Sequence, residues 1–280
     1  MDPYKDFTTR FSLFAAKHPE IITLTLSNIF TMRLIGNKTH GDLAEIAIAE
    51  FINQYMYDFS SIHVGKDLYR AKSREEDITI KNEVTGSEFP VSLKAYGDGP
   101  LQLSTDKDFR MFPLLSTYGD LIDDPGHIAE IFSSDEFSYF SDINVLPLIY
   151  DEKRQRCNIL VFDSEKAKLA TKYIHKASAG HGRKHPAYRF YDEDEQYICE
   201  VRYGNAAANA LQRGLWTHTK NALPFFESVT NGWIRYEHNK TLVQLLSHAL
   251  VSGENGHAAA LDIVKQDIQQ IKSASRVNAN

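Results

Sequence analysis

The sequence is poor in cysteine and has no long uninterrupted apolar run. Two cysteines in 280 residues, Cys157 and Cys199, cannot build a disulfide framework or a zinc site made only of cysteines. No segment approaches the roughly 18 apolar residues that a membrane-spanning helix needs. The polar opening residues 1–6 have no signal-peptide hydrophobic region. We therefore expect a cytoplasmic protein with no membrane partner.

The sequence also lacks internal repeats, low-complexity segments and any linker rich in proline, serine or glycine. A chain of 280 residues is long enough for one large domain or two small ones. Because no linker divides it, we expect a single domain over residues 1–280.

The formal net charge of −6 is unevenly distributed along the chain. Residues 98–152 contain 2 basic and 12 acidic residues, a net charge of −10, whereas residues 153–240 contain 15 basic and 9 acidic residues, a net charge of +6. Because contacts with phosphate act within about a Debye length, an acidic protein can still present a basic surface to nucleic acid. The alternative is ordinary surface charge in both segments.

Apolar periodicity predicts helices at the start of the chain, strands after them and further helices toward the end. The expected helices cover 6–17, 21–35, a stretch from about 39–42 to 56, 164–177, 206–220, 240–251 and 257–273. The expected strands cover 61–69, 77–81, 89–96, 145–150, 158–162, 188–191 and 196–203, with an irregular acidic stretch before residue 145. This order predicts a mixed α/β (α+β) fold, with a central mixed β-sheet flanked by helices.

The most informative residues are an aspartate at the start of one apolar strand and a lysine inside the next. Asp77 heads the first strand, and Lys94 shares one face of the second strand with Ser92 and Tyr96. The turn-rich residues 82–88 allow the two strands to pair as a hairpin. A carboxylate can hold a divalent cation, and an ammonium can orient water and offset charge on phosphorus. The alternatives are a strand-end role for Asp77 and an edge strand with a solvated polar face for Lys94.

A tight loop with two glycines and a proline, residues 97–100, follows the lysine strand directly. A backbone without side chains can approach a phosphate closely. Gln102, Ser104 and Thr105 add neutral hydrogen-bonding groups after it. The loop lacks the Gly-Lys-Ser/Thr ending of a Walker motif.

This arrangement resembles the PD-(D/E)xK nuclease superfamily, and in particular its type II restriction endonucleases. The resemblance covers about residues 39–105, where a helix with an acid, a strand, the aspartate strand, the lysine strand and a glutamine-bearing segment follow the order of the superfamily's α-β-β-β core. It implies a restriction-endonuclease-like core, double-stranded DNA as the substrate and Mg²⁺ as the cofactor, with Mn²⁺ able to substitute.

The resemblance also implies roles for individual residues. Asp77 matches the metal-binding aspartate and Lys94 matches the catalytic lysine. Glu45 resembles the acid that many members carry on the first core helix, and Gln102 resembles the glutamine that follows the lysine in some branches. The carbonyl of Leu93 would be a further metal ligand.

The sequence departs from the family two residues before the lysine, where members have Asp or Glu and this chain has Ser92. Serine is a poor ligand for a hard cation, which prefers charged oxygens. A second carboxylate must then come from elsewhere, with Glu45 as the first candidate and Glu50 as the second. The same departure is compatible with a protein that binds DNA without cutting it.

Residues 180–203 mix basic and aromatic side chains, and the helix predicted at 206–220 follows them. Such a mixture suits phosphate positioning and base reading. The alternative is an amphipathic helix with a solvated polar face. We expect DNA contacts from Arg183, Lys184, His185, Arg189, Arg202, Asn209 and Arg213, together with Ser104 and Thr105.

These patterns favour a Mg²⁺-dependent type II restriction endonuclease that acts on duplex DNA as a homodimer, because two sites related by a twofold axis can cut both strands of a palindrome. The rivals are a repair or resolvase nuclease on the same core and a catalytically inactive DNA-binding module. The expected regions are N-terminal helices over 1–60, catalytic strands over 61–105, DNA recognition over 153–240 and C-terminal helices over 240–275.

Overall fold

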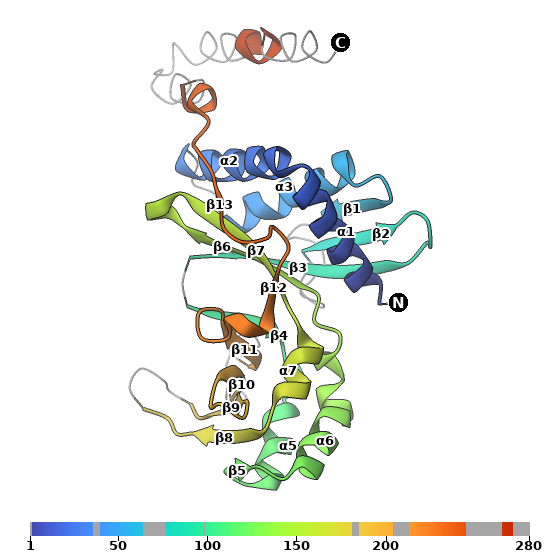
Figure 1. The fold of residues 1–280 in the computed structure, drawn as a ribbon, viewed down its shortest axis with the longest axis vertical. Helices are drawn as coiled ribbons and strands as arrows, with labels where there is room; N and C mark the ends of the chain where they lie inside the picture. Colours follow the sequence, from blue (N-terminus) through green and yellow to red (C-terminus); the bar gives the residue numbers. More distant parts are fainter. Residues whose placement is uncertain are drawn as a thin grey trace.

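The computed structural model has a mixed α/β fold built around two β-sheets (Figure 1). It describes residues 2–35, 40–63, 77–97, 99–180, 185–203, 213–244 and 265–270. Within these residues one sheet has seven strands of mixed direction, and the other has six antiparallel strands. No helix in the described part of the chain has the length and apolar character needed to cross a membrane.

In the described part of the chain, three helices come first, and strands and shorter helices follow them. In the first half they are α1 (Pro3–Lys17), α2 (Pro19–Ile35), α3 (His40–Tyr55), β1 (Phe59–His63), β2 (Ile78–Asn82), β3 (Glu88–Tyr96), β4 (Pro100–Ser104), α5 (Met111–Tyr118), β5 (Leu121–Ile122), α6 (Pro125–Ser133) and η1 (Asp135–Phe140). In the second half they are β6 (Val145–Asp151), η2 (Glu152–Arg154), β7 (Arg156–Phe162), α7 (Ser164–Ala170), β8 (Tyr173–Ala177), β9 (Ala187–Tyr191), β10 (Tyr197–Arg202), β11 (Gly214–His218), η4 (Leu223–Phe225), β12 (Phe226–Ser228) and β13 (Ile234–Arg235). Residues 240–244 and 265–270 are also helical.

The first sheet has the strand order β1-β2-β3-β6-β7-β12, with β13 paired to β7. Strands β1, β2 and β3 form an antiparallel meander, and β3 runs parallel to β6. Its apolar face, which includes Ile78, Ile80, Val91 and Leu93, shares one hydrophobic cluster with α1, α2 and α3. Because side chains alternate along a strand, Ser92 and the side chains in step with it lie on the opposite face, away from these helices.

The second sheet has the strand order β4-β11-β10-β9-β8-β5. One face carries fully buried side chains, among them Ile174, Tyr188, Phe190 and Val201, which cluster with residues of α5, α6 and η1. The other face of the sheet carries the polar and half-buried side chains of the same strands. Each sheet therefore has its own hydrophobic cluster, and the polar faces are left for other contacts.

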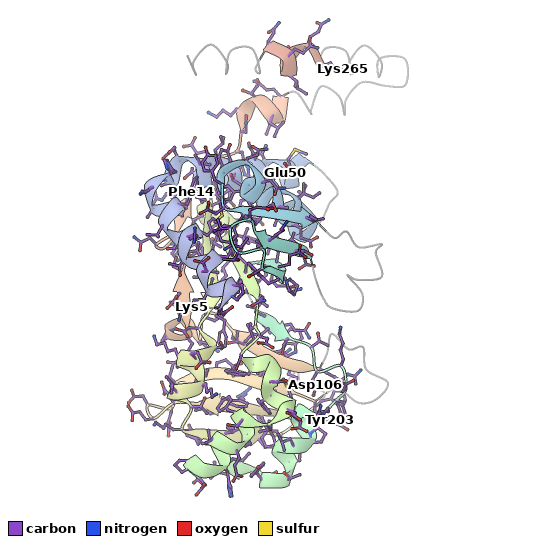
Figure 2. The ribbon with its side chains drawn as sticks, turned by 90° about the vertical axis from the view of Figure 1, so that its right-hand side faces the viewer. Lys5, Phe14, Glu50, Asp106, Tyr203 and Lys265 are labelled. Atoms are coloured by element: carbon purple, nitrogen blue, oxygen red, sulfur yellow. The ribbon has the colours of Figure 1, made fainter. Side chains whose placement is uncertain are left out.

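The two sheets are joined where β3 ends and β4 begins. β3 belongs to the first sheet and β4 to the second, although only a few residues separate them. The hydroxyl of Tyr96 donates to Thr219 Oγ1 at 2.6 Å and links the two parts through side chains. Figure 2 shows the same division, with Phe14 and Glu50 in the helical part and Asp106 and Tyr203 in the other.

Most of the predicted helices and strands in the first sheet, and two strands of the second, agree with the structure. The three opening helices and the strands β2, β3, β6, β7, β9 and β10 lie within a few residues of their predicted positions. β1 is described only to His63, because residues 64–76 lie outside the described part. Cys157 and Cys199 are free and buried, and burial raises the pKa of both thiols.

Two helix predictions are wrong. The helix expected at 164–177 ends at Ala170, and Tyr173–Ala177 forms β8 because it pairs with β9 and buries Ile174. The helix expected at 206–220 is the strand β11 over Gly214–His218, and residues 204–212 lie outside the described part. In both segments strand pairing overrides helix propensity, which is a weak determinant.

The acidic stretch before residue 145 is not irregular. It contains β4, α5, β5 and α6, and two acidic side chains accept backbone N–H groups where the helices start. The carboxylate of Asp106 accepts the N–H groups of Arg110 and Met111 at 2.9 and 2.8 Å, and Asp124 caps α6 just before a proline. Acidic residues there serve as helix caps, which the sequence argument did not recognise.

Candidate active site

The carboxylate of Asp77 is held by three groups on the neighbouring strand. Asp77 Oδ2 accepts the hydroxyl of Ser92 at 2.9 Å and the backbone N–H of Leu93 at 2.7 Å. The same oxygen lies 3.9 Å from Nζ of Lys94. None of these three contacts uses Oδ1. The structure therefore brings Asp77 and Lys94 to the same face of the sheet.

The β2–β3 register explains why Asp77 takes this position. Ile78 pairs with Val91, and the N–H of Asp77 donates to the carbonyl of Val91 at 3.3 Å. The next backbone donor on β3 is the amide of Leu93. It donates to the side chain of Asp77 and not to a backbone carbonyl of the neighbouring strand. A carboxylate fixed by a backbone donor has a defined orientation, which a binding or catalytic group requires.

Lys94 is close to Asp77 without being hydrogen-bonded to it. A separation of 3.9 Å exceeds hydrogen-bonding distance, so this contact leaves the ammonium protons able to donate to another group. The side chains of Lys94 and Asp77 are 34% and 23% exposed. An ion pair between side chains with this exposure contributes little to the stability of the fold. Stability alone therefore does not explain why a lysine stands at position 94.

Glu45 lies at the same end of the strands but on the helix-covered side of the sheet. The side chain of Asn53 in α3 accepts the backbone N–H of Ser61 at 2.7 Å and donates to its carbonyl at 3.0 Å. The Ser61 hydroxyl donates to the carbonyl of Ala49 at 2.8 Å. Glu45 precedes Ala49 by one helical turn, roughly 6 Å further toward the strand ends where Asp77 lies. Its side chain is buried, with 7% exposure. The proposal that it binds the same metal stays a prediction.

Two other predicted residues occupy different settings. Glu50 is exposed on α3. Gln102 lies in β4 of the second sheet, whereas Asp77 and Lys94 belong to the first, and its Nε2 donates to the carbonyl of Arg213 at 3.0 Å. Its amide thus holds the backbone of Arg213 at the start of β11.

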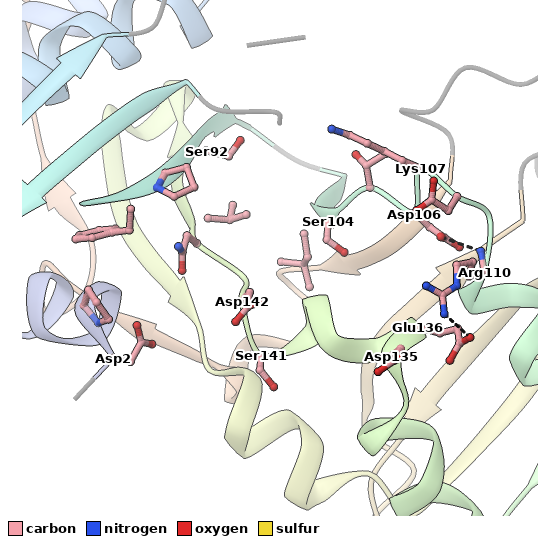
Figure 3. Close-up of a pocket in the computed structure, with 18 residues that line it drawn as sticks. Asp2, Ser92, Ser104, Asp106, Lys107, Arg110, Asp135, Glu136, Ser141 and Asp142 are labelled. Atoms are coloured by element: carbon pink, nitrogen blue, oxygen red, sulfur yellow. Dashed lines mark hydrogen bonds and ion pairs between the residues drawn. The ribbon is translucent and has the colours of Figure 1, made fainter. Parts of the chain in front are cut away.

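A cavity of about 700 Å³ has Ser92 in its lining (Figure 3), whereas Asp77 and Lys94 do not line it. Ser92 and Pro90 of β3 line it, and so do Ser104, the last residue of β4, and Thr105, which follows it. Because the Ser92 hydroxyl contacts Asp77, the carboxylate lies next to this cavity. The structure therefore brings Ser104 and Thr105, which were predicted to contact DNA, to the cavity that adjoins the predicted catalytic residues.

The lining of this cavity is acidic. Its charged residues are Asp2, Asp106, Lys107, Asp108, Arg110, Asp135, Glu136 and Asp142. Some of these acids have structural roles: Asp106 caps α5, and the Arg110 guanidinium, 2.7 Å from Glu136, holds the pKa of that carboxyl below its usual range. An acidic cavity repels a polyanion, so the lining of this cavity does not favour nucleic acid inside it. Among the residues that the structure describes, no three His, Cys, Asp or Glu side chains gather in a way that could hold a metal ion.

Two of the predicted DNA-contacting arginines share a buried partner. Glu200 of β10 is 1% exposed, and its two oxygens lie 3.4 Å from Nε of Arg189 and 2.7 Å from Nε of Arg202. The guanidinium of Arg202 also stacks over the ring of Trp216 at 4.3 Å. These contacts fix both arginines on the polar face of the second sheet and offset part of their charge.

This pairing predicts a stability effect that DNA-binding assays must take into account. In the double variant Arg189→Ala/Arg202→Ala, Glu200 would be left buried without either guanidinium, and we expect a loss of about 3–5 kcal/mol. Adding Glu200→Gln should recover much of this loss, because the buried charge is then removed. Urea denaturation of the double and triple variants measures the difference, and equal stability would show that the carboxylate does not depend on the two arginines.

The other predicted DNA contacts divide into described and undescribed residues. The Arg213 guanidinium lies over the ring of Phe109 at 5.4 Å, and the His185 ring lies 6.1 Å from that of Tyr203. The predicted contacts Arg183, Lys184 and Asn209 lie outside the described residues.

Some of the aromatic side chains noted within residues 180–203 belong to a row of rings on the polar face of the second sheet, and the sequence analysis did not predict that row. Tyr173 and Tyr191 stack at 5.0 Å with an interplanar angle of 13°, and Tyr197 and His218 continue the row at 6.2 and 6.1 Å. The signal was present as alternation, since Tyr188 and Phe190 are buried while Arg189 and Tyr191 face the other side. Aromatic faces of this kind can stack on bases.

Comparisons with protein-family models, with curated proteins and with solved structures found no match for this chain. Function is therefore inferred from the residues and their geometry.

Proposed function

We propose that this protein is a Mg²⁺-dependent endonuclease that hydrolyses phosphodiester bonds of double-stranded DNA, in the manner of a type II restriction enzyme acting as a homodimer. The observation that carries the proposal is the Asp77 group. One carboxylate oxygen receives a serine hydroxyl and a backbone amide and lies 3.9 Å from the Lys94 ammonium, at the edge of two adjacent strands.

The order of elements around this group supports the family resemblance. The helix α3, which carries Glu45, is followed by the antiparallel strands β1, β2 and β3. Asp77 immediately precedes β2, and Lys94 lies in β3. This is the α-β-β-β order that the resemblance implies. That these elements form a restriction-endonuclease-like core is part of the proposal.

The donor groups around Asp77 suit a magnesium ion. Mg²⁺ is usually bound through one or two carboxylates, several waters and substrate phosphates. Asp77 would hold it, with the carbonyl of Leu93 as a neighbouring oxygen. Glu45, the further ligand that the resemblance implies, is buried on the helix-covered side of the sheet and would have to reach the ion from there. When bound, such an ion polarises the phosphoryl group and lowers the pKa of its water.

The residues of the chain would contribute orientation and charge. Lys94 would donate to the attacking water or to a phosphoryl oxygen, and so stabilise the negative charge that develops as the water oxygen bonds to phosphorus and the leaving oxygen departs. Ser92 and the amide of Leu93 would keep the Asp77 carboxylate in one orientation during this step. Neither role requires movement of the backbone.

The second sheet would supply the DNA-contacting surface. Arg189, Arg202, Arg213 and His185 lie on or beside it, and Ser104 and Thr105 connect it to the cavity rim. Phosphate contacts by such residues fix the register of a duplex, and base-edge contacts give sequence preference. Two copies of the chain would place one Asp77 group on each strand of a palindromic site.

The first test is incubation of the purified protein with supercoiled plasmid in Mg²⁺, in Mn²⁺ and in EDTA. We expect discrete linear fragments with either metal ion and uncut plasmid with EDTA. Cleavage of branched DNA in preference to plasmid would favour the repair or resolvase alternative. Plasmid binding without any metal-dependent cleavage would contradict the proposal and favour the inactive DNA-binding module, which the serine at position 92 makes a serious alternative.

A further inference from the structure

Glu200 is a buried acid in the middle of the second sheet, and the proposed chemistry does not use it. It is 1% exposed, and its register partners on the neighbouring strands are Arg189 and Trp216. One carboxylate oxygen accepts the Nε–H of Arg202 at 2.7 Å, and the other lies 3.4 Å from Nε of Arg189. Burying a carboxylate is costly, and pairing it with arginines often does no more than recover that cost. Stability therefore does not explain why an acid stands at this position.

A second arginine of the chain has the same kinds of contact but a different acid. The Arg156 guanidinium lies over the ring of Trp233 at 4.4 Å, and its Nε is 3.3 Å from Asp151. Asp151 is 27% exposed, so an acid that is open to water is enough to hold an arginine against a tryptophan. Glu200 is almost completely buried, and water competes little for its oxygens. Its contact with Arg202 therefore fixes the arginine more firmly than a structural role requires.

The contacts of Arg202 leave part of its guanidinium to a ligand. Its hydrogen bond to Glu200 uses Nε, and Trp216 lies against one face of the guanidinium plane at 4.3 Å. The two terminal NH₂ groups are the ones that can bind the O6 and N7 acceptors of guanine in the major groove. The side chain is 25% exposed, so a ligand can reach it. Arg189 is held less firmly, because its Nε makes no hydrogen bond within the described residues.

We propose that Glu200 determines the sequence preference of the protein: it positions Arg202 to read guanine, and it limits the binding of both arginines to phosphate. The inference rests on the proposed DNA-cleaving function and adds which base is read and which residue enforces the reading. Arginines with an unopposed charge bind phosphates at any sequence. The negative charge of Glu200 offsets part of this attraction and leaves the directional hydrogen bonds to a base edge. Glu200 is thus a positioning residue that does not itself contact DNA.

The experiment measures DNA binding by the full-length protein in EDTA, so it does not depend on cleavage. Duplexes that bind wild type are selected from a random pool and are made again with 7-deazaguanine, which lacks the N7 acceptor. We expect wild type to bind the 7-deazaguanine duplexes about tenfold more weakly than the unmodified ones, as the loss of one bidentate base contact predicts. Arg202→Lys keeps the charge but not the planar fork, and it should lose most of this difference.

Glu200→Gln gives the readout that a structural role would not produce. Glutamine keeps the size of the side chain and an oxygen acceptor, but a neutral acceptor holds a guanidinium less strongly than a carboxylate does. This variant should bind the unselected random duplexes about threefold more tightly than wild type, with a steeper dependence on salt, because more arginine charge is open to phosphate. The effect of 7-deazaguanine should shrink at the same time. The matched control is Arg156→Lys, which should behave like wild type in all these measurements.

An effect of 7-deazaguanine that is undiminished in either variant would overturn the inference. Weaker binding of Glu200→Gln to every duplex would also overturn it, because that result indicates a structural role alone. A plasmid gel separates the two proposals. The expected binding pattern without Mg²⁺-dependent cleavage would refute the nuclease function alone, whereas cleavage by wild type with unchanged guanine dependence in the variants would refute only this inference.

Discussion

Replacing Asp77 by asparagine should reduce Mg²⁺-dependent DNA cleavage by on the order of 10³-fold. A metal ion contributes several kcal/mol of transition-state stabilisation, and each 1.36 kcal/mol is a factor of ten in rate. Asparagine keeps the size of the side chain and an oxygen that can accept the Ser92 hydroxyl and the Leu93 amide. The loss should therefore come from the missing charge and not from misfolding. The measurement is single-turnover cleavage of plasmid, with DNA binding expected to change by no more than about threefold.

A matched control for this variant is Asp151→Asn. Asp151 is also a half-buried carboxylate of the first sheet, 27% exposed and 3.3 Å from Nε of Arg156. It lies at the far end of β6 and has no place in the proposed chemistry. Cleavage by this variant should match wild type. A cleavage rate of Asp77→Asn close to wild type would show that the proposed active site is wrong.

Replacing Lys94 by glutamine should reduce cleavage by about 10²–10³-fold, which is the usual cost of removing one donor that stabilises developing charge. The effect should appear in the rate of the chemical step at saturating DNA, because Lys94 is proposed to act on the attacking water or on the transition state. Glutamine keeps a long polar side chain on β3, so the sheet edge should stay intact.

Lys81→Gln is the corresponding control. Lys81 lies at the other end of β2, where Nζ is 3.4 Å from Glu83, and it faces the same side of the sheet as Lys94. Its removal should leave the cleavage rate unchanged. If Lys94→Gln and Lys81→Gln slow cleavage equally, a general effect of surface charge on DNA binding accounts for both, and Lys94 has no specific role.

The convergence of Asp77 and Lys94 could be predicted from the sequence because it depends on local rules. Alternation along β3 places Ser92 and Lys94 on one face. The short turn after β2 leads the chain directly back, so β2 and β3 pair with each other. These rules act over fewer than twenty residues, so they do not require knowledge of distant contacts. The predicted opening helices are correct for the same reason, since Phe7 and Phe11 recur at helical spacing and are fully buried.

The second sheet could not be predicted because it depends on contacts between distant segments. β4 pairs with β11, more than a hundred residues later in the chain, and the predicted helix around Gly214–His218 gives way to this pairing. At Gly214 the φ angle is +101° and an added Cβ would lie 2.3 Å from the carbonyl of Ser104. Only the partner strand makes this glycine necessary, so the sequence alone carries no signal of it.

The acidic cavity was also beyond sequence reasoning. The sequence shows that residues 98–152 are acidic, but it does not show that Asp106, Asp135 and Asp142 line the same cavity as Ser92. Arg189 and Arg202 lie on predicted strands, but their pairing with the buried Glu200 was not predicted. Buried ion pairs of this kind depend on strand register, which a list of charges does not contain.

The most direct test of the central claim is to map where a divalent ion binds on the protein. Fe²⁺ in place of Mg²⁺, with ascorbate and hydrogen peroxide and with duplex DNA present, generates radicals that cut the polypeptide near the bound ion, and mass spectrometry locates the cuts. We predict cuts clustered around residue 77 and residues 92–94, suppressed by excess Mg²⁺ and absent in Asp77→Asn. Cuts that fall elsewhere, or that persist in Asp77→Asn, would contradict a cation site between the two strands.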